Sequence, residues 1–569
     1  MNIPDNSIPS SPSHPKDHDG VETAIAAITA NDNNKNVFDL TDLPNDLFFL
    51  ITSYLSPQDC VLCRRVSRAW LAAFTNPDTS WNFMRWHFAR SREMRRAPAE
   101  LGEKPDWARI FAKVARRYHY LRAAKPRLIE KIDVVQEAAG LKGSFKGVAP
   151  WNRWLRWNDN TAIFQHRDPT WCVDDGLLVY QEAVSERYVA YDLETRMRFE
   201  VPFDASDKTV RRLRLTSGVL VFEWCEREPY HQLNDRETVH RHFATAFDVQ
   251  RRASSGDSSS SEVQFTWDIT FRSEWKIHFL GLPVNGHDRF FSAHTSTHYA
   301  LYLWQPNRSP WGEEDPLEQL TIWDISKPST YRPSLDPSGA NKPYSSPGLD
   351  HEGPTVINRF TWRELELLGI RQRHTPSLRE ILLDEANVYI HEEEHRWLAG
   401  QHSSLSPPRH HLVRCTGIPF SGMGPRWFDE CCADGDVHMS FCPRVGSLAR
   451  ILGNNQLAGS KGLWPGYAPC WRHEEFPYLT VSDVLDAGAG VRVVARQCFM
   501  MEALSSFVMP KISVQEERDG GLGEEEDQVS EVQFADSMWW ELLAKGKIAG
   551  DERWVVGEDG MGRVTIVRF

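Results

Sequence analysis

The pattern of apolar and polar positions divides the chain into four stretches. Residues 1–36 are mostly Pro, Ser, Asn and Asp with little to bury, which predicts a disordered tail. From residue 37 to 88, apolar residues recur at helical spacing. Residues 89–150 contain a basic stretch with apolar residues at helical spacing beneath the charges, which predicts a helical linker. After Trp151 the chain turns to short alternating segments with turn residues between them, a pattern typical of β-strands.

Three pairs of these β segments form related units. Each unit is an apolar strand, a polar interval and a second strand that ends aromatic-Asp-aliphatic. The first two units begin at Gly176 and Gly218, about 42 residues apart, which suits a four-stranded propeller blade. We therefore expect an all-β, propeller-like domain over residues 151–569, although a sandwich or barrel of the same strand count would give similar signals. The paired segments are 176–180 with 188–193, 218–222 with 243–249, and 289–293 with 320–325.

The rest of this β region contains further strand patterns and polar inserts. More strands are expected at 380–391, 438–442, 491–499 and 554–569, the last as a hairpin that turns at Asp559-Gly560. Disordered surface inserts are expected near 251–262, 326–354 and 516–531, where apolar residues are few. Loops at 225–241, 251–262 and 326–354 are either recognition loops or tolerated surface insertions.

Composition narrows the class of protein. The 569 residues are 41% hydrophobic and 25% charged, as in ordinary globular proteins, and their net charge of −13 gives no global attraction to nucleic acid or to an anionic membrane. No run of about 18 apolar residues occurs, so neither a spanning helix nor a membrane partner is expected. The N-terminus lacks a secretory signal pattern, and the ten Cys are irregularly spaced. We therefore expect reduced thiols and a cytoplasmic or nuclear location.

The helical stretch between residues 40 and 81 predicts three short helices. Asp42 can cap the first helix. Ser56 can cap a second helix, with Pro57 in its first turn, and this helix is expected to extend through Val66. A third helix is expected from about Ser67 to the residue before Asn76. The first helix has one apolar stripe, formed by Leu47, Leu50, Ile51, Tyr54 and Leu55.

Some apolar residues lie off this stripe. Leu43, Phe48 and Phe49 are left over in a unit that is too small to be stable by its own burial. Surplus apolar residues of this kind predict a surface for a partner, and packing on the rest of the chain is the alternative.

The same stretch resembles an F-box. The residues that match the family pattern in order are Leu43-Pro44, Asp46, Ile51, Tyr54-Leu55, Pro57, Asp59, Val66-Ser67-Arg68, Trp70 and Trp81. Two positions depart from the pattern: Asp46 stands where Glu is commoner, and Cys60 where Leu is usual. The match covers less than a tenth of the chain.

The resemblance implies a function. F-box domains dock on a Skp-family adaptor, which links them to a cullin–RING ubiquitin ligase, and many carry a C-terminal recognition module. The resemblance implies that Trp70 anchors the third helix. Carried over by position, the adaptor-binding residues are Leu43, Pro44, Leu47, Ile51, Leu55, Val66 and Trp70.

We therefore expect an α+β multidomain protein, in which a short all-α F-box domain and a helical linker precede an all-β domain. Its expected function is a non-catalytic substrate-recognition subunit of a Skp–cullin–F-box ubiquitin ligase, with an unknown protein as its substrate. An F-box scaffold that acts outside a ligase is an alternative.

Two groups of residues suggest a metal site. His391-Glu-Glu-Glu-His395 matches the H-E-x-x-H pattern of zinc hydrolases, a second alternative function, but the lead-in to it alternates like a strand. An extended backbone would separate the two His residues by about 13 Å, too far to share a metal. Cys431, Cys432 and Cys442, with His438 between them, lack paired C-x-x-C spacing and are read as reduced thiols. No catalytic residue, metal or cofactor is therefore expected.

The basic stretch at 89–127 allows two interpretations. It is either a nuclear-import or nucleic-acid patch, or a helical linker whose basic face meets the acidic remainder of the chain. The apolar residues beneath its charges favour the second, so no nucleic-acid partner is expected.

Overall fold

The fold is taken from a computed structural model of the chain. The residues that it describes are 39–95, 105–135, 170–232, 235, 238–253, 265–278, 282–283, 289–305, 315–342, 353–373, 377–397, 409–420, 427–433, 441–442, 468–469, 478–486, 488–502, 505–516, 530–543 and 547–569. These residues form two compact units. The first comprises residues up to 89 together with 104–115, and the second comprises 90–103 together with 116–569.

The first unit is helical. After the 3₁₀ turn η1 (Leu40–Asp42) come α2 (Asn45–Thr52), α3 (Pro57–Cys63), α4 (Arg68–Thr75) and α5 (Pro77–His87), followed by the first half of α8 (Trp107–Arg122). Residues in the sequence mark the start of several of these helices. Ser56 accepts the backbone N–H of Asp59 at the start of α3, and Ser67 accepts that of Trp70 at the start of α4, as N-caps do. Pro57 and Pro77 occupy first-turn positions, where a missing N–H costs nothing.

Two expected boundaries in this unit were wrong. Asp42 does not cap α2, because it lies in η1 and forms a reciprocal capping box with Asp39. The second helix does not extend through Val66, because α3 ends at Cys63 and Val66 lies in the turn before α4.

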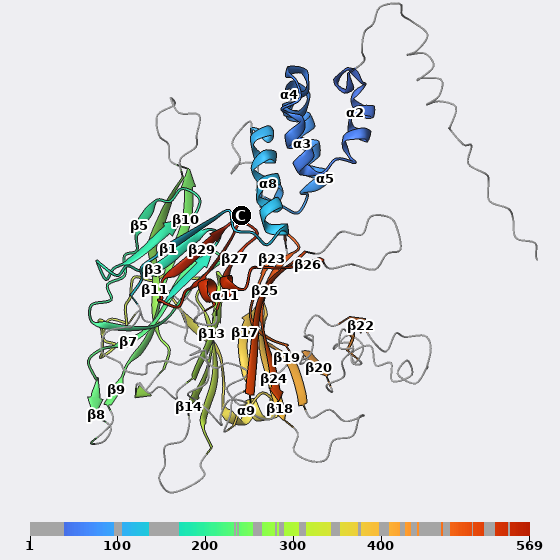
Figure 1. The fold of residues 1–569 in the computed structure, drawn as a ribbon. Coiled ribbons are helices and arrows are strands. Elements are labelled where there is room, and N and C mark those ends of the chain that lie inside the picture. Colours follow the sequence, from blue (N-terminus) through green and yellow to red (C-terminus); the bar gives the residue numbers. More distant parts are fainter. Residues whose placement is uncertain are drawn as a thin grey trace, which may run out of the picture. The chain divides into compact units, whose positions relative to one another are not determined.

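The second unit contains six four-stranded antiparallel sheets among its described residues (Figure 1). In chain order the first five are β2 (Trp171–Asp174) to β5 (Arg198–Glu200); β6 (Lys208–Thr216), β7 (Val219–Glu226), β10 (His242–Ala253) and β11 (Phe265–Lys276); β13 (Arg289–His294) to β16 (Thr355–Phe360); β17 (Leu378–Leu383) to β20 (Trp427–Ala433); and β23 (Tyr478–Asp486) to β26 (Ser530–Gln533). The sixth combines β27 (Ala549–Asp551), β28 (Trp554–Glu558) and β29 (Val564–Arg568) with β1 (Leu128–Ile132).

The two middle strands of the first, third, fourth and fifth sheets have the following bounds. They are β3 (Leu177–Gln181), β4 (Tyr188–Asp192), β14 (His298–Gln305), β15 (Leu317–Asp324), β18 (Asn387–Trp397), β19 (Arg409–Pro419), β24 (Val491–Glu502) and β25 (Ser505–Glu516). Short strands outside the blades are β8 (His231–Gln232), β9 (Thr238–His240), β12 (Leu282–Pro283), β21 (Phe441–Cys442) and β22 (Ala468–Pro469). Three short helices, α6 (Arg92–Arg95), α9 (Trp362–Leu368) and α11 (Ser537–Leu542), complete the described elements of this unit.

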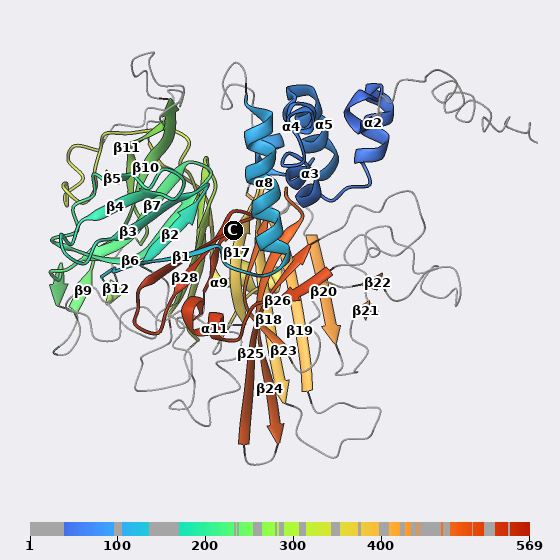
Figure 2. The ribbon, with the colours of Figure 1, turned by 45° about the horizontal axis from the view of Figure 1, so that its top comes forward.

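The six sheets are the blades of a β-propeller. Neighbouring blades meet through their inner strands: β2 contacts β6, β13 contacts β17, and β27 contacts both β2 and β23, so the last blade joins the first. Figure 2 shows β23, β24 and β25 of one blade side by side. Apolar clusters fill the space between neighbouring blades. Phe222 packs with Val179 of the preceding blade, and Ile566 of the last blade packs with Tyr180 of the first. Burial of this kind is what holds propeller blades together.

The glycines that lead the first two repeat units form tight hairpins. Asp175-Gly176 joins β2 to β3, and Ser217-Gly218 joins β6 to β7. All four residues have positive φ, between 46° and 81°, as a type I′ turn requires. The paired strands expected in these units are confirmed, as is the hairpin at Asp559-Gly560.

Three other expectations need adjustment. In the third unit the strand before β15 is β14, whereas the segment 289–293 forms the innermost strand β13. The stretch 89–150 includes β1, which pairs with β29 as well as following helix α8. Residues 326–342 of the expected disordered insert form a loop that hydrogen-bonds to β11, through Ser329 N–H to the Arg272 carbonyl (2.9 Å). The remaining insert positions 254–262, 343–352 and 517–529 lie outside the described residues.

Candidate functional site

The core of the helical unit is aromatic. Phe48 of α2 packs against Phe74 of α4, with ring centroids 5.3 Å apart, and Phe74 packs against Phe83 of α5 at 5.8 Å. Phe111 of α8 extends the stack from Phe83 at 5.4 Å. All four rings are buried. Cys60, at the position where the family pattern usually has Leu, is also fully buried, and burial raises the pKa of its thiol to about 12.

The apolar stripe of α2 faces outward. Leu47, Leu50, Ile51 and Tyr54 are exposed, whereas Phe48 lies in the core with Thr52. This corrects the expectation that Phe48 is left over for a partner. The ring of Phe74 on α4 contacts Phe48 and so selects the face of α2 that contains Phe48 and Thr52.

The expected adaptor-binding residues share one stretch of chain but differ in exposure. Ile51 is 45% exposed and Val66, in the turn after α3, is 62% exposed. Pro44 and Leu47 are also exposed, whereas Leu43 and Leu55 are half-buried. Leu62 of α3 adds an exposed apolar side chain that we had not expected at this site. The exposed residues form the partner surface considered below: Pro44, Leu47, Leu50, Ile51, Tyr54, Leu62 and Val66.

Trp70 holds α4 to the start of the unit. Its indole N–H donates to Asp39 Oδ1 at 2.7 Å, and its ring stacks on Phe74 with an interplanar angle of 11°. Trp70 is half-buried, so it fixes the third helix of the motif while keeping one part at the surface. The sequence did not reveal the Asp39 contact, because Asp39 precedes the motif.

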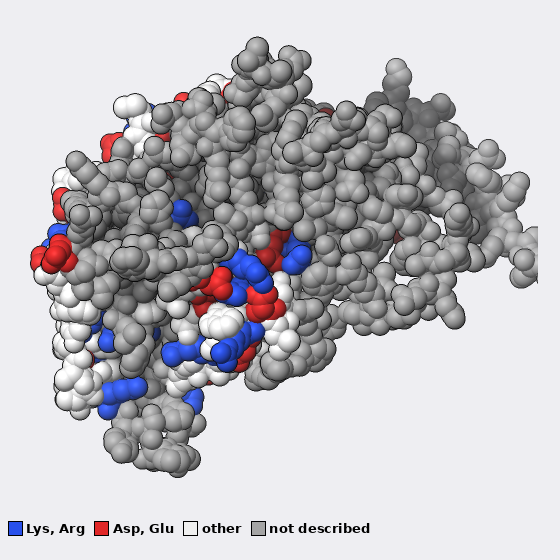
Figure 3. Space-filling view, turned by 90° about the horizontal axis from the view of Figure 1, so that it is seen from below, with Lys and Arg blue, Asp and Glu red and all other residues white. Residues whose placement is uncertain are grey.

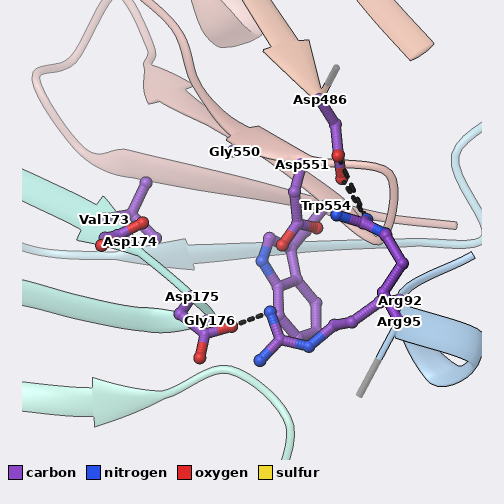
Figure 4. Close-up of a pocket in the computed structure, with 10 residues that line it drawn as sticks. All are labelled: Arg92, Arg95, Val173, Asp174, Asp175, Gly176, Asp486, Gly550, Asp551 and Trp554. Carbon is purple, nitrogen blue, oxygen red and sulfur yellow. Dashed lines mark hydrogen bonds and ion pairs between the residues drawn. The ribbon is translucent and has the colours of Figure 1, made fainter. Parts of the chain in front are cut away.

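A charged cleft lies on the second unit, where α6 meets the hairpin turns of the propeller (Figure 4). Its volume is about 270 Å³. Arg95 Nη2 lies 3.1 Å and 3.2 Å from the two carboxylate oxygens of Asp486, and Arg92 pairs with Asp175. Both arginines of the cleft are thus paired with carboxylates of its wall, and Asp551 pairs with Arg553.

Behind this cleft, a buried carboxylate anchors the basic stretch. Glu552 is fully buried and accepts the Arg92 backbone N–H at 2.8 Å and Arg117 Nη2 at 3.0 Å, and it also accepts the Tyr118 hydroxyl. Arg117 in turn makes two hydrogen bonds to Glu93. These contacts support the interpretation that the basic face of the stretch 89–127 meets acidic groups of the remainder of the chain.

The H-E-x-x-H residues lie on a strand. His391 and His395 both belong to β18, where they pair with Cys415 and His411 of β19. The extended backbone separates them by about 13 Å, whereas a zinc site needs both rings on one helical turn about 6 Å apart. The expectation of a strand here is confirmed. Within the part of the chain that the structure describes, no three His, Cys, Asp or Glu side chains gather as a metal site. Most of the segment with Cys431, Cys432, His438 and Cys442 has no described side chains.

No helix in the described ranges is both long and apolar enough to cross a membrane.

Comparison with known proteins identifies the helical unit. A family model described as F-box-like matches residues 40–84. No curated protein matches the chain. Similar solved structures include a chain of "Crystal Structure of Mitotic Checkpoint Complex" (7% identity, 78% of this chain, 95% of that chain, TM-score 0.24). Others are the β-propeller domain of Myceliophteria thermophila Cps50 (Swd1) (11%, 71%, 98%, TM-score 0.25) and Drosophila Semaphorin 1b, extracellular domains 1-2 (10%, 71%, 63%, TM-score 0.17).

The helical unit and the six blades together define the class. The chain contains a helical F-box-like domain that precedes a six-bladed β-propeller. It is an α+β protein of the expected architecture. This combination is typical of non-catalytic adaptors.

Proposed function

We propose that this chain is the substrate-recognition subunit of a Skp–cullin–F-box ubiquitin ligase. The exposed apolar residues of α2 and α3 carry the proposal. A stripe of large apolar side chains on a small helical unit is costly in water unless a partner covers it. The F-box-like match at residues 40–84 supports a Skp-family adaptor as that partner.

The mechanism that we propose is proximity. The F-box holds the adaptor while the propeller holds a target protein, which raises the effective concentration of the target's lysines near the ubiquitin carrier. The chain itself then needs no catalytic group. We also propose that it acts in the cytoplasm or the nucleus, which cell fractionation tests.

The test is co-purification of the full-length chain with a Skp-family adaptor and cullin. Wild type should capture both, and the double variant Leu43→Ala/Pro44→Ala should stay folded but lose both. If wild type captures the adaptor without cullin, the chain is an F-box scaffold that acts outside a ligase. Failure of wild type to capture any adaptor would refute the proposal.

A further inference from the structure

Helix α9 displays apolar side chains at the connection between the third and fourth blades. Trp362 is 46% exposed and Leu367 is 67% exposed, whereas Leu365 on the same helix is fully buried in the core between these blades. The helix starts with a capping box between Thr361 and Glu364 and ends at Gly369, whose φ is 70°. The exposed residues therefore sit on a helix that is fixed at both ends.

A buried polar network holds the chain that follows α9. Glu318 of β15 accepts the backbone N–H groups of Gln372 and Arg373, each at 2.7 Å, and the hydroxyl of Tyr302. Gln372 in turn donates to Glu392 of β18 at 2.7 Å. Burying a carboxylate is unfavourable unless its hydrogen bonds are made, and here two of those made by Glu318 fix the backbone of one surface connection. Such preorganisation is what a binding site needs, because less conformational freedom is lost on association.

The arginines near Trp362 differ in whether they pair with a carboxylate. The guanidinium carbons of Arg363 and Arg371 lie 5.1 Å and 5.0 Å from the centre of its ring. Arg371 pairs with Asp315 at 2.7 Å, and Arg373 pairs with Glu366. The other acid of the helix, Glu364, is engaged with Thr361, and these hydrogen bonds lower the pKa of Glu364. Among the described groups, therefore, Arg363 is the arginine of this connection that has no carboxylate partner.

We propose that Trp362, Arg363 and Leu367, which we call the α9 surface, bind an acidic segment of a target protein that carries a large apolar side chain. A target carboxylate would pair with Arg363 while the apolar side chain packs on Trp362 and Leu367. Trp and Arg are the residue types that most often dominate binding energy at interfaces. Figure 3 shows that positive, negative and uncharged side chains are mixed over the described part of the face that it draws. The inference rests on the proposed function, because it specifies the target that the propeller recruits.

The test is selection of dodecamer peptides from a random displayed library on the full-length protein, followed by fluorescence polarisation with the selected peptides. We expect a consensus of Asp or Glu next to a large apolar residue. Trp362→Ala and Arg363→Glu should each weaken binding about tenfold or more. Matched controls are Trp540→Ala, which removes a tryptophan of similar exposure (52%) on α11, and Arg227→Glu at another exposed arginine. The controls should bind like wild type.

Adaptor capture, measured on the same preparations, separates this inference from the proposed function. The α9 variants should capture the Skp-family adaptor as wild type does. Unchanged peptide affinity in both α9 variants, a consensus without acids, or no enriched peptide at all would each overturn the inference and leave the proposed function standing. Peptide binding at the α9 surface by a chain that captures no adaptor would instead refute the proposed function alone.

Discussion

The ring of Phe48 meets the ring of Phe74 edge-on, with an interplanar angle of 70° and a centroid separation of 5.3 Å. This pair decides which side of α2 faces the core. With Phe48 turned inward, the row of Leu47, Ile51 and Tyr54 is left at the surface. The orientation of one helix thus creates the surface that we propose binds the adaptor.

The first prediction concerns this pair. Phe48→Ala should destabilise the helical unit by about 3–5 kcal/mol, because it removes a buried ring and leaves a cavity. Leu50→Ala, on the exposed row of the same helix, should change stability by less than about 0.5 kcal/mol. Native-state hydrogen exchange of peptides from residues 45–87 measures both. Equal effects of the two substitutions would contradict the assigned orientation of α2.

The second prediction concerns the buried carboxylate behind the charged cleft. Glu552→Ala should cost about 3–5 kcal/mol, because it leaves Arg117 buried with one partner fewer. As a control, Glu200→Ala removes one member of the exposed pair Arg187–Glu200 and should cost at most about 1 kcal/mol. Hydrogen exchange of the β27–β28 hairpin reports the difference. A cost for Glu552→Ala no larger than that of the control would show that the network does not hold the propeller.

The third prediction is a pH dependence. Burial, with Arg214 and Arg272 nearby, lowers the pKa of His294 to about 4, and its ring hydrogen-bonds to the Val219 carbonyl (2.9 Å). Since an unfolded His binds its proton near pH 6.5, the unfolded state binds more protons below that pH. His294 therefore contributes stability that is complete above about pH 6.5 and is lost as the pH falls towards 4.

Urea unfolding at a series of pH values checks this dependence. Stability of the wild type should fall between about pH 6.5 and 4, and His294→Gln, which keeps a hydrogen-bond donor, should show a smaller slope over the same range. The same slope in both proteins would assign the acid sensitivity to other groups.

The fourth prediction concerns the closure of the ring. β1 supplies the fourth strand of the last blade and pairs with β29 along Leu128–Ile132. A chain that starts at residue 151 lacks this strand and the contacts of α6 and α8, so it should aggregate or unfold at a lower temperature. A chain that starts at residue 90 retains both and should unfold cooperatively at a higher temperature. Calorimetry of the two fragments tests this, and equal stability would place the start of the propeller domain near residue 151.

The sequence predicts the parts of this fold that depend on local chemistry. Asp175-Gly176 and Ser217-Gly218 are turn pairs whose φ values only a few residue types adopt easily. The strands β3 and β7 that follow them were predicted, whereas β2 and β6 before them were not. Ser56 and Ser67 cap helices by contacts within three residues, and both helix starts were predicted correctly.

Contacts between distant residues were not predictable in this way. Both faces of α2 carry large apolar side chains, and the choice between them depends on the ring of Phe74, more than twenty residues away. The strand at 128–132 lies next to a basic helix, and its partner is at the other end of the chain. The α9 surface carries no sequence motif, and the Glu318 network that holds the chain after α9 joins residues more than fifty positions apart.

The most direct test of the account is the affinity of the purified full-length chain for a Skp-family adaptor, measured by calorimetry for wild type, Ile51→Asp and Trp86→Asp. Both substitutions place a charge at an exposed apolar position of the helical unit, on α2 and α5 respectively. The account predicts binding that Ile51→Asp weakens about 30-fold or more and that Trp86→Asp leaves within about twofold of wild type. Binding by Ile51→Asp that equals wild type would contradict the claim that the exposed row of α2 is the adaptor site.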